Sequence, residues 1–173
     1  MIALEMIFYG LNKAVILGVL HAVDLGGSMT IHMFGAYFGL TATFFFKSRR
    51  AITESWEQSK GNYNSQLISM VGTLFLFVYW PSFNSALAVG VNQQRAALNT
   101  FFSITTSALT AGYISRCVTG KLDMEVIMNA TLAGGVMIAA ACDMIFNPGF
   151  AMLVGGLAGI ASSLGYLKLN YFM

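Results

Sequence analysis

The chain has 173 residues, of which 57% are hydrophobic and only 9% are charged, and its formal net charge is +2. With a mean hydropathy of +0.69, this composition excludes an ordinary soluble domain and predicts an all-α integral membrane protein. No basic cluster rich enough for nucleic acid occurs outside one loop, so nucleic acid is not expected as a partner. The two cysteines, Cys117 and Cys142, lie in a basic loop and an apolar segment and are expected to be unpaired.

Six segments are apolar over about the 20 residues that a helix needs to cross the hydrocarbon core of a bilayer. They cover residues 2–20, 27–46, 67–89, 96–115, 126–146 and 149–169. If successive helices alternate in direction, loops 47–60 and 116–121 share one face with the end of the sixth segment. The opposite connections carry Arg95 alone, whereas this face carries seven basic residues, Lys47, Arg49, Arg50, Lys60, Arg116, Lys121 and Lys168. The positive-inside rule therefore predicts that both loops are cytoplasmic and that the second segment begins at the outer surface.

The second segment carries His32, and no charged residue follows it until Lys47. Because lipid offers no hydrogen bonds, an imidazole at this depth is expected to face a protein interior or a water-filled path. At 100° per residue, His32 shares a helix face with Ser28, Gly35 and Gly39, and the two glycines form a GxxxG pattern typical of close helix packing. Two interpretations of His32 stay open: a buried histidine hydrogen-bonded within a tight helix pair, and a pore-lining residue.

Two aspartates stand near the outer ends of apolar segments. Asp24 precedes a glycine pair at the start of the second segment, where its carboxylate can accept hydrogen bonds from the first free backbone N–H groups of a helix. Such a cap is compatible with a role in shaping a pore mouth, because it fixes where His32 points. Asp143, near the outer end of the fifth segment, is either a solvated carboxylate or a group that attracts cations at a pore mouth.

The third segment contains Pro81, which removes one backbone hydrogen bond and is expected to kink the helix. Four residues around it share one face at i, i+3, i+4, i+7 spacing, namely Trp80, Phe83, Asn84 and Leu87. Two aromatic rings and an amide beside a kink can form a gate, and ordinary helix packing is the alternative.

The fifth and sixth segments contain clusters of glycine. Small residues let the backbones of membrane helices approach closely. Packing faces are therefore predicted at Gly134, Gly135, Gly155 and Gly159.

Three long stretches occur in order along the chain: GSMTIH with FGAYFGL around His32, GTLFL with YWPSFNSA around Pro81, and GKLDM with NATLAGGV ending at Val136. Together they resemble the Rh (rhesus) glycoproteins of the ammonium transporter/Rh superfamily. The resemblance extends over about residues 11–166.

This resemblance implies a trimer in the bilayer, in which each subunit has its own narrow channel for ammonia between two inverted five-helix repeats. In that family the histidine matching His32 belongs to a hydrogen-bonded pair that lines the path. The Phe matching Phe83 closes the outer mouth, the Trp matching Trp80 lies on the same helix, and the aspartate matching Asp24 supports the structure near the mouth. A multi-pass protein of the plasma membrane is expected.

Two departures from the family pattern stand out. Bacterial and plant-type ammonium transporters have a serine where this chain has Leu87, which favours passage of the neutral gas over capture of the cation. The six segments resemble only the fourth to ninth of eleven or twelve family helices, and the second histidine is expected beyond Met173. Residues 1–173 are therefore expected to form a partial transmembrane domain, as a fragment or truncated isoform that does not conduct alone.

The leading functional prediction is an Rh-type ammonia/ammonium channel, with carbon dioxide left open as a second gas. The alternative is a non-conducting structural or regulatory subunit that assembles with full-length relatives. An enzyme is not expected, because the sequence has no Ser/His/Asp constellation at membrane depth, no phosphate-binding glycine loop and no second His or Cys spaced for a metal. Neither a cofactor nor a metal is expected.

Overall fold

The computed structural model describes residues 1–46 and 62–172, and within them every regular element is a helix. In chain order these are α1 (Ile2–Lys13), η1 (Ala14–Val19), η2 (Ser28–Met33), α2 (Phe34–Phe46), α4 (Tyr63–Ser85), α5 (Val91–Thr119), α6 (Met124–Ala139) and α7 (Pro148–Phe172). The two η elements are π-helical and continue directly into or out of α-helices. The predicted all-α class is confirmed.

Four helical stretches are long and apolar enough to cross a membrane: Ile2–Val19, Ser28–Phe46, Tyr63–Ser85 and Pro148–Lys168. They correspond to four of the six predicted segments. The helix of the fifth segment, α6, has 16 residues and ends at Ala139, so the prediction that it continues to residue 146 is wrong. The third helix, α4, begins at Tyr63 and ends at Ser85, earlier at both ends than predicted, and continues through Pro81.

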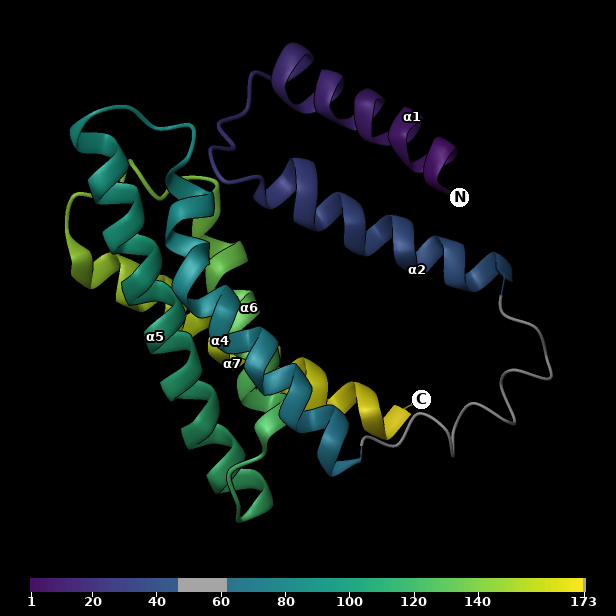
Figure 1. Ribbon diagram of the computed structural model, residues 1–173, viewed down its shortest axis with the longest axis vertical. Coiled ribbons are helices and arrows are strands. Elements are labelled where there is room, and N and C mark those ends of the chain that lie inside the picture. The colour runs from purple at the N-terminus through teal and green to yellow at the C-terminus, as the bar shows by residue number, and fades with distance from the viewer. Residues whose placement is uncertain (47–61, 173) are drawn as a thin grey trace.

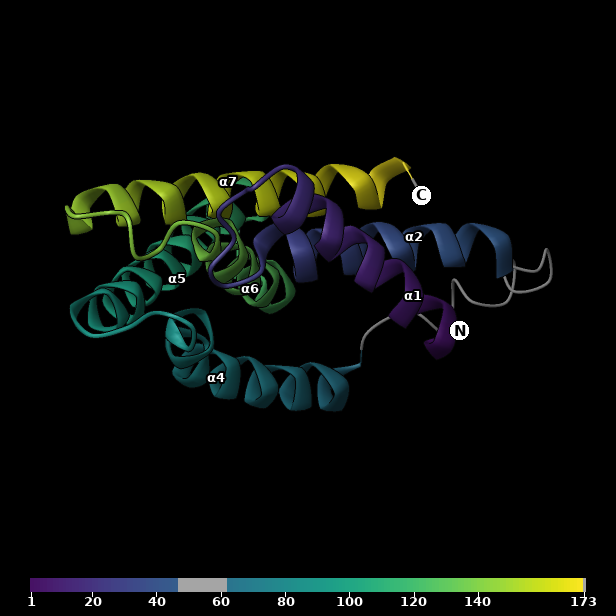
Figure 2. The ribbon, with the colours of Figure 1, turned by 90° about the horizontal axis from the view of Figure 1, so that it is seen from above.

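Helices α4 to α7 form a bundle in which α5 and α6 lie between α7 and α4 (Figure 2). The helices approach closely where they carry glycine. A Cβ atom built at Gly134 would lie 2.6 Å from the Cβ of Ser107, and one built at Gly159 would lie 2.6 Å from the carbonyl oxygen of Ser107. A Cβ at Gly155 would overlap the carbonyl of Ser103. The glycines therefore allow backbone contact between α5 and its two neighbours.

The side of α5 that faces α6 is polar, which explains why the hydropathy of this 29-residue helix is low. Ser103 donates a hydrogen bond to the carbonyl oxygen of Gly134 at 2.8 Å, and Ser107 donates to that of Ala130 at 2.6 Å. Asn99 donates to the carbonyl oxygens of Cys142 and Ile145 at 2.8 and 2.7 Å. These bonds satisfy buried polar groups within the bundle, as an apolar surrounding requires.

Helices α1 and α2 form a pair that extends away from the bundle (Figure 1). Loop 20–27 joins them and contacts α6 through its backbone. Leu25 N–H donates to the carbonyl oxygen of Ala140 at 3.1 Å, and Gly26 N–H donates to that of Ala139 at 2.8 Å. A Cβ built at Gly35 or Gly39 would meet nothing within 4 Å, so these glycines contact no helix of the described residues. Their predicted role in helix packing stays a prediction.

Candidate functional site

Asp24 caps the π-helical segment that carries His32. Its carboxylate accepts hydrogen bonds from the backbone N–H of Met29 at 3.1 Å and of Thr30 at 2.7 Å, and from the Thr30 hydroxyl at 2.8 Å. The carboxylate thus satisfies donors that have no partner inside the helix, and its charge is favourable at a helix N-terminus. The structure places Asp24 as a cap, and its influence on a pore mouth stays a prediction.

Ser28 closes the end of α6 from a position more than a hundred residues away in sequence. Its hydroxyl donates to the carbonyl oxygen of Val136 at 2.5 Å and accepts from the N–H of Ala140 at 2.8 Å. These two backbone groups are four residues apart, so in a continuing α-helix they would bond to each other. The hydroxyl is inserted between them, and α6 ends at Ala139. Ser28 was predicted on the His32 face from the helix period, but no pattern in the sequence indicates this role.

The backbone at His32 is π-helical. Gly27 has a φ of 78°, and its carbonyl oxygen accepts hydrogen bonds from the N–H groups of both Ile31 and His32 at 3.0 Å. The bond to His32 spans five residues and widens the turn. Short π-helical turns inside helices are common at functional sites. In the widened turn each residue advances by less than about 100°. The direction of the His32 side chain therefore differs from the one predicted for a regular α-helix.

His32 lies against two aromatic rings of α4. The imidazole is stacked on Trp80, with ring centroids 5.5 Å apart and an interplanar angle of 26°, and meets Phe83 edge-on at 6.0 Å. The three residues line an open groove of about 260 Å³ together with Leu76 and Tyr79. His32 Nε2 and Trp80 Nε1 are buried, and neither has a hydrogen-bond partner among the described residues. A half-buried imidazole whose Nε2 lacks a partner, beside an apolar groove, is a candidate binding site for a small polar molecule.

Gly135 positions the indole of Trp80. A Cβ built at Gly135 would lie 2.5 Å from Cε2 and 2.6 Å from Nε1 of Trp80. The ring therefore lies directly against the backbone of α6, and only glycine leaves room for it. Gly135 was predicted as a packing residue, and the structure shows that the contact it makes is with an aromatic residue of the groove.

Asn84 and Leu87, predicted to line a pore with Trp80 and Phe83, lie elsewhere. Asn84 is fully buried and donates to the hydroxyl of Thr100 at 3.2 Å and to the carbonyl oxygen of Gly135 at 3.1 Å, so it joins α4 to α5 and α6. Leu87 follows the end of α4 and is 77% exposed. Neither lines the groove at His32. Trp80 and Phe83 share a helix face as predicted, and Leu87 does not continue it because the chain turns after Ser85. The pore-lining role of these residues stays a prediction.

Asp143 lies in the turn after α6, beside Arg95 of α5. The Arg95 guanidinium donates to the backbone carbonyl of Asp143 at 3.1 Å and lies 4.2 Å from the ring centroid of Phe146. The carboxylate oxygen Oδ1 of Asp143 is buried without a hydrogen-bond partner among the described residues. Its predicted attraction for cations at a pore mouth stays a prediction.

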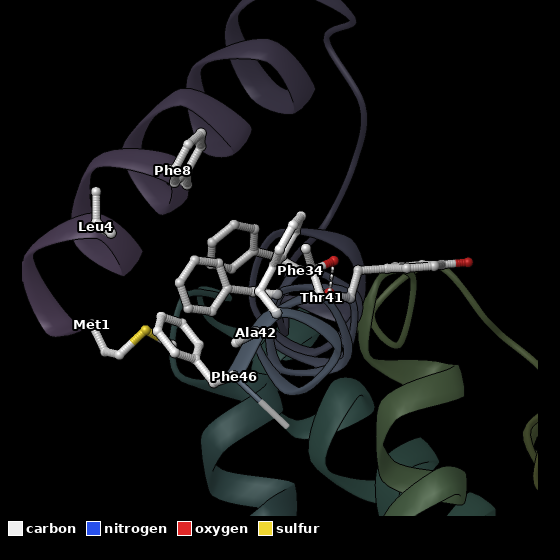
Figure 3. A pocket seen from close by; sticks show the side chains of 10 residues that line it. Met1, Leu4, Phe8, Phe34, Thr41, Ala42 and Phe46 are labelled. Atoms are coloured by element: carbon white, nitrogen blue, oxygen red, sulfur yellow. Dashed lines mark hydrogen bonds between the residues drawn. The ribbon is translucent and has the colours of Figure 1, made fainter. Parts of the chain in front are cut away.

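A second groove, between α1 and α2, has a volume of about 350 Å³ and is lined mainly by apolar side chains (Figure 3). The hydroxyl of Thr41 already donates to the carbonyl oxygen of Tyr37 at 2.8 Å. This groove offers little to recognise a polar ligand. Among residues 1–46 and 62–172, no group of three or more His, Cys, Asp or Glu side chains is placed to hold a metal ion.

Comparison with known proteins identifies the class to which this fold belongs. The sequence model of the Ammonium Transporter Family matches residues 2–172. The chain belongs to that family, and the multi-pass membrane character and the predicted resemblance are confirmed. The family is one of transporters rather than enzymes.

The curated relatives narrow the resemblance to the Rh branch. Ammonium transporter Rh type C of Rattus norvegicus and of Homo sapiens are each 46% identical to this chain over 172 residues, which is 98% of the chain. The aligned part is 34% of the rat protein and 36% of the human protein. The chain thus spans about a third of the length of these relatives.

Two solved structures have the same fold. The structure of Nitrosomonas europaea Rh50, described with the conduction mechanism of the Rhesus protein family of channels, is 29% identical, with a TM-score of 0.84 over 91% of this chain and 42% of that chain. A sensor Amt protein, 24% identical, gives a TM-score of 0.70 over 84% of this chain and 37% of that chain, and supports the fold alone.

Proposed function

We propose that this chain forms one wall of a transmembrane path for ammonia, with His32 lining the path and Phe83 at its outer mouth. The observation that carries the proposal is the imidazole of His32, which lines an apolar groove with Trp80 and Phe83 and whose Nε2 has no hydrogen-bond partner among the described residues. An imidazole offers an acceptor or a donor to a molecule as small as ammonia, according to its tautomer. The family match and the Rh type C relatives support this choice of substrate.

The groove favours the neutral gas over the ammonium ion. Its five lining residues are His32, Leu76, Tyr79, Trp80 and Phe83, and none of them is a carboxylate. A cation moved into such an apolar place loses its hydration without gaining an opposite charge, whereas ammonia needs only one or two hydrogen bonds. Ammonium is therefore expected to pass its proton to water outside the groove, so that neutral ammonia reaches His32. Carbon dioxide, which is also neutral, is the second gas proposed for the same path.

The groove at His32 is open on one side, and Phe83 is 48% exposed. A path through a membrane must be enclosed by protein on all sides, because lipid does not form hydrogen bonds with polar groups. We therefore propose that the chain by itself does not conduct, and that further helices, in a homotrimer or in an assembly with related subunits, close the groove. The proposed location is the plasma membrane, with loops 47–60 and 116–121 cytoplasmic. The first of these loops lies outside the described residues.

The test is ammonia influx into liposomes that contain this chain with the subunits that co-purify with it from its source membrane, followed by a pH-sensitive dye. Replacing His32→Ala is expected to reduce the influx to that of empty liposomes. The matched control is His21→Ala, because His21 is the other histidine of the chain and lies exposed in the loop after η1. Equal influx in wild type and His32→Ala, with intact assembly, would contradict the path and favour a structural subunit.

A second reconstitution tests the role of the partner helices. Liposomes that contain only the 173-residue chain are expected to match empty liposomes in ammonia influx. Influx clearly above that background would show that the open groove suffices for conduction. The vesicles of the first test, which hold the assembled complex, report carbon dioxide entry as a fall in luminal pH that is faster than in empty liposomes.

A further inference from the structure

A polar groove of about 720 Å³ lies between the N-terminal halves of α4 and α6. It is larger than the groove at His32, and Leu76 lines both. Along α4, the residues Ser65, Ser69, Thr73 and Leu76 lie on the same helix face as Trp80 and Phe83. The two grooves therefore follow one side of the same helix, with the polar groove at the end opposite to Phe83.

Glu125 supplies a carboxylate to this polar groove. Its Oε1 accepts a hydrogen bond from the Gln66 amide at 2.9 Å, and its Oε2 accepts one from the Tyr166 hydroxyl. Both donors are neutral, and no Lys or Arg of residues 1–46 and 62–168 forms an ion pair with Glu125. The hydrogen bonds from Tyr166 first and Gln66 second hold the pKa of Glu125 below its usual value. The carboxylate is thus held by two neutral donors and ionised near neutral pH, and within the described part of the chain no basic side chain pairs with it.

The other polar groups of the groove are suited to a hydrogen-bond donor. Thr73 donates its hydroxyl proton to the carbonyl oxygen of Ser69 at 2.9 Å, so its oxygen faces other molecules as an acceptor. Asn129 lies four residues after Glu125 on the same face of α6 and also lines the groove. A carboxylate with hydroxyl and amide oxygens nearby matches a small cation that carries several N–H groups.

We propose that the groove at Glu125 is a binding site for ammonium or another small protonated amine, at the end of the path opposite to Phe83. The inference rests on the proposed function for its place along a path, but the binding itself does not require conduction. The charged form is bound at Glu125, where a carboxylate balances it, and the neutral form passes His32, where none does.

The test is equilibrium binding of radiolabelled methylammonium to the purified 173-residue chain in detergent micelles at pH 7. Saturable binding is expected for the wild type. Glu125→Gln keeps the shape and one acceptor oxygen but removes the charge, and is expected to weaken binding about tenfold or more. Glu5→Gln, which makes the same change of charge at an exposed position of α1, is the matched control and is expected to stay within about twofold of wild type.

Two further variants separate charge from structure and binding from conduction. Tyr166→Phe keeps the carboxylate and is expected to retain binding, and circular dichroism checks that each variant folds. His32→Ala is expected to bind methylammonium like the wild type although it abolishes influx. The site is refuted if the wild type shows no saturable binding, if Glu125→Gln binds equally well, or if Tyr166→Phe loses binding to the same extent. Loss of binding in Glu125→Gln with unchanged influx in His32→Ala would instead refute the proposed path and leave the site in place.

Discussion

The contact between Gly135 and Trp80 makes a stringent prediction for Gly135→Ala. The new Cβ would lie 2.5 Å from Cε2 of the indole, about 1 Å short of an ordinary contact. The indole is rigid and His32 is stacked near it at 5.5 Å, so the ring has little freedom to move aside. Overpacking of this kind costs about 1–3 kcal/mol, against a gain of about 1 kcal/mol from the better helix propensity of alanine. The net change expected is a loss of about 0–2 kcal/mol.

Gly72→Ala is the matched control, because a Cβ at this position of α4 would meet nothing within 4 Å. It gains the same helix propensity without the clash, so the difference between the two variants isolates the steric cost of about 1–3 kcal/mol. The free energy of unfolding is measured by denaturant titration in micelles. In a Trp56→Phe background Trp80 is the only tryptophan of the chain, and its emission is expected to shift in Gly135→Ala alone. Equal stability and equal emission in the two alanine variants would refute the contact.

Two other predictions concern hydrogen bonds that join distant segments. Ser28→Ala removes the hydroxyl that accepts a hydrogen bond from the N–H of Ala140 at 2.8 Å. Leaving these part-buried backbone groups without a partner is expected to cost about 1–3 kcal/mol of stability. Amide hydrogen exchange at Ala140 should accelerate, and unchanged exchange would contradict the role of Ser28. The pKa of Glu125 lies below its usual 4.5 in the folded state, so its hydrogen bonds stabilise the fold fully above that pH and lose this contribution as the pH falls through the lowered pKa. The difference in unfolding midpoint between wild type and Glu125→Gln should stay constant from pH 7 to about 4.5 and shrink below it; a difference that already shrinks near pH 6 would be inconsistent with the lowered pKa.

Hydropathy located the helices well because the requirement behind it is local. A helix that crosses the lipid needs a run of consecutive apolar residues, and such a run can be recognised directly in the sequence. The boundaries were less accurate where a distant segment sets them. The end of α6 at Ala139 depends on Ser28 and on the backbone of Leu25 and Gly26, which no pattern near residue 139 reveals.

Helical periodicity predicted which residues share a face, but not what that face meets. Trp80 and Phe83 were placed together correctly, and the structure brings them to His32. Asn84 was predicted beside them, yet it lies one step round the helix against α5 and α6, where its amide joins three helices. Phe83 and Asn84 are adjacent in the helix and point about 100° apart. The positions of the neighbouring helices decide that Phe83 lines the groove and Asn84 lies in the core.

The sequence by itself determined the membrane class and the family, because composition and local motifs contain that information. The cap by Asp24 was also foreseeable, because its carboxylate and the N–H of Thr30 that it accepts from are only six residues apart. Only the tertiary structure decided that Ser28 ends α6, that Gly135 makes room for Trp80, and that Glu125 faces a groove that shares Leu76 with the groove at His32. These contacts join residues far apart in the chain, so they depend on how the helices pack and not on the order of residues within any one of them.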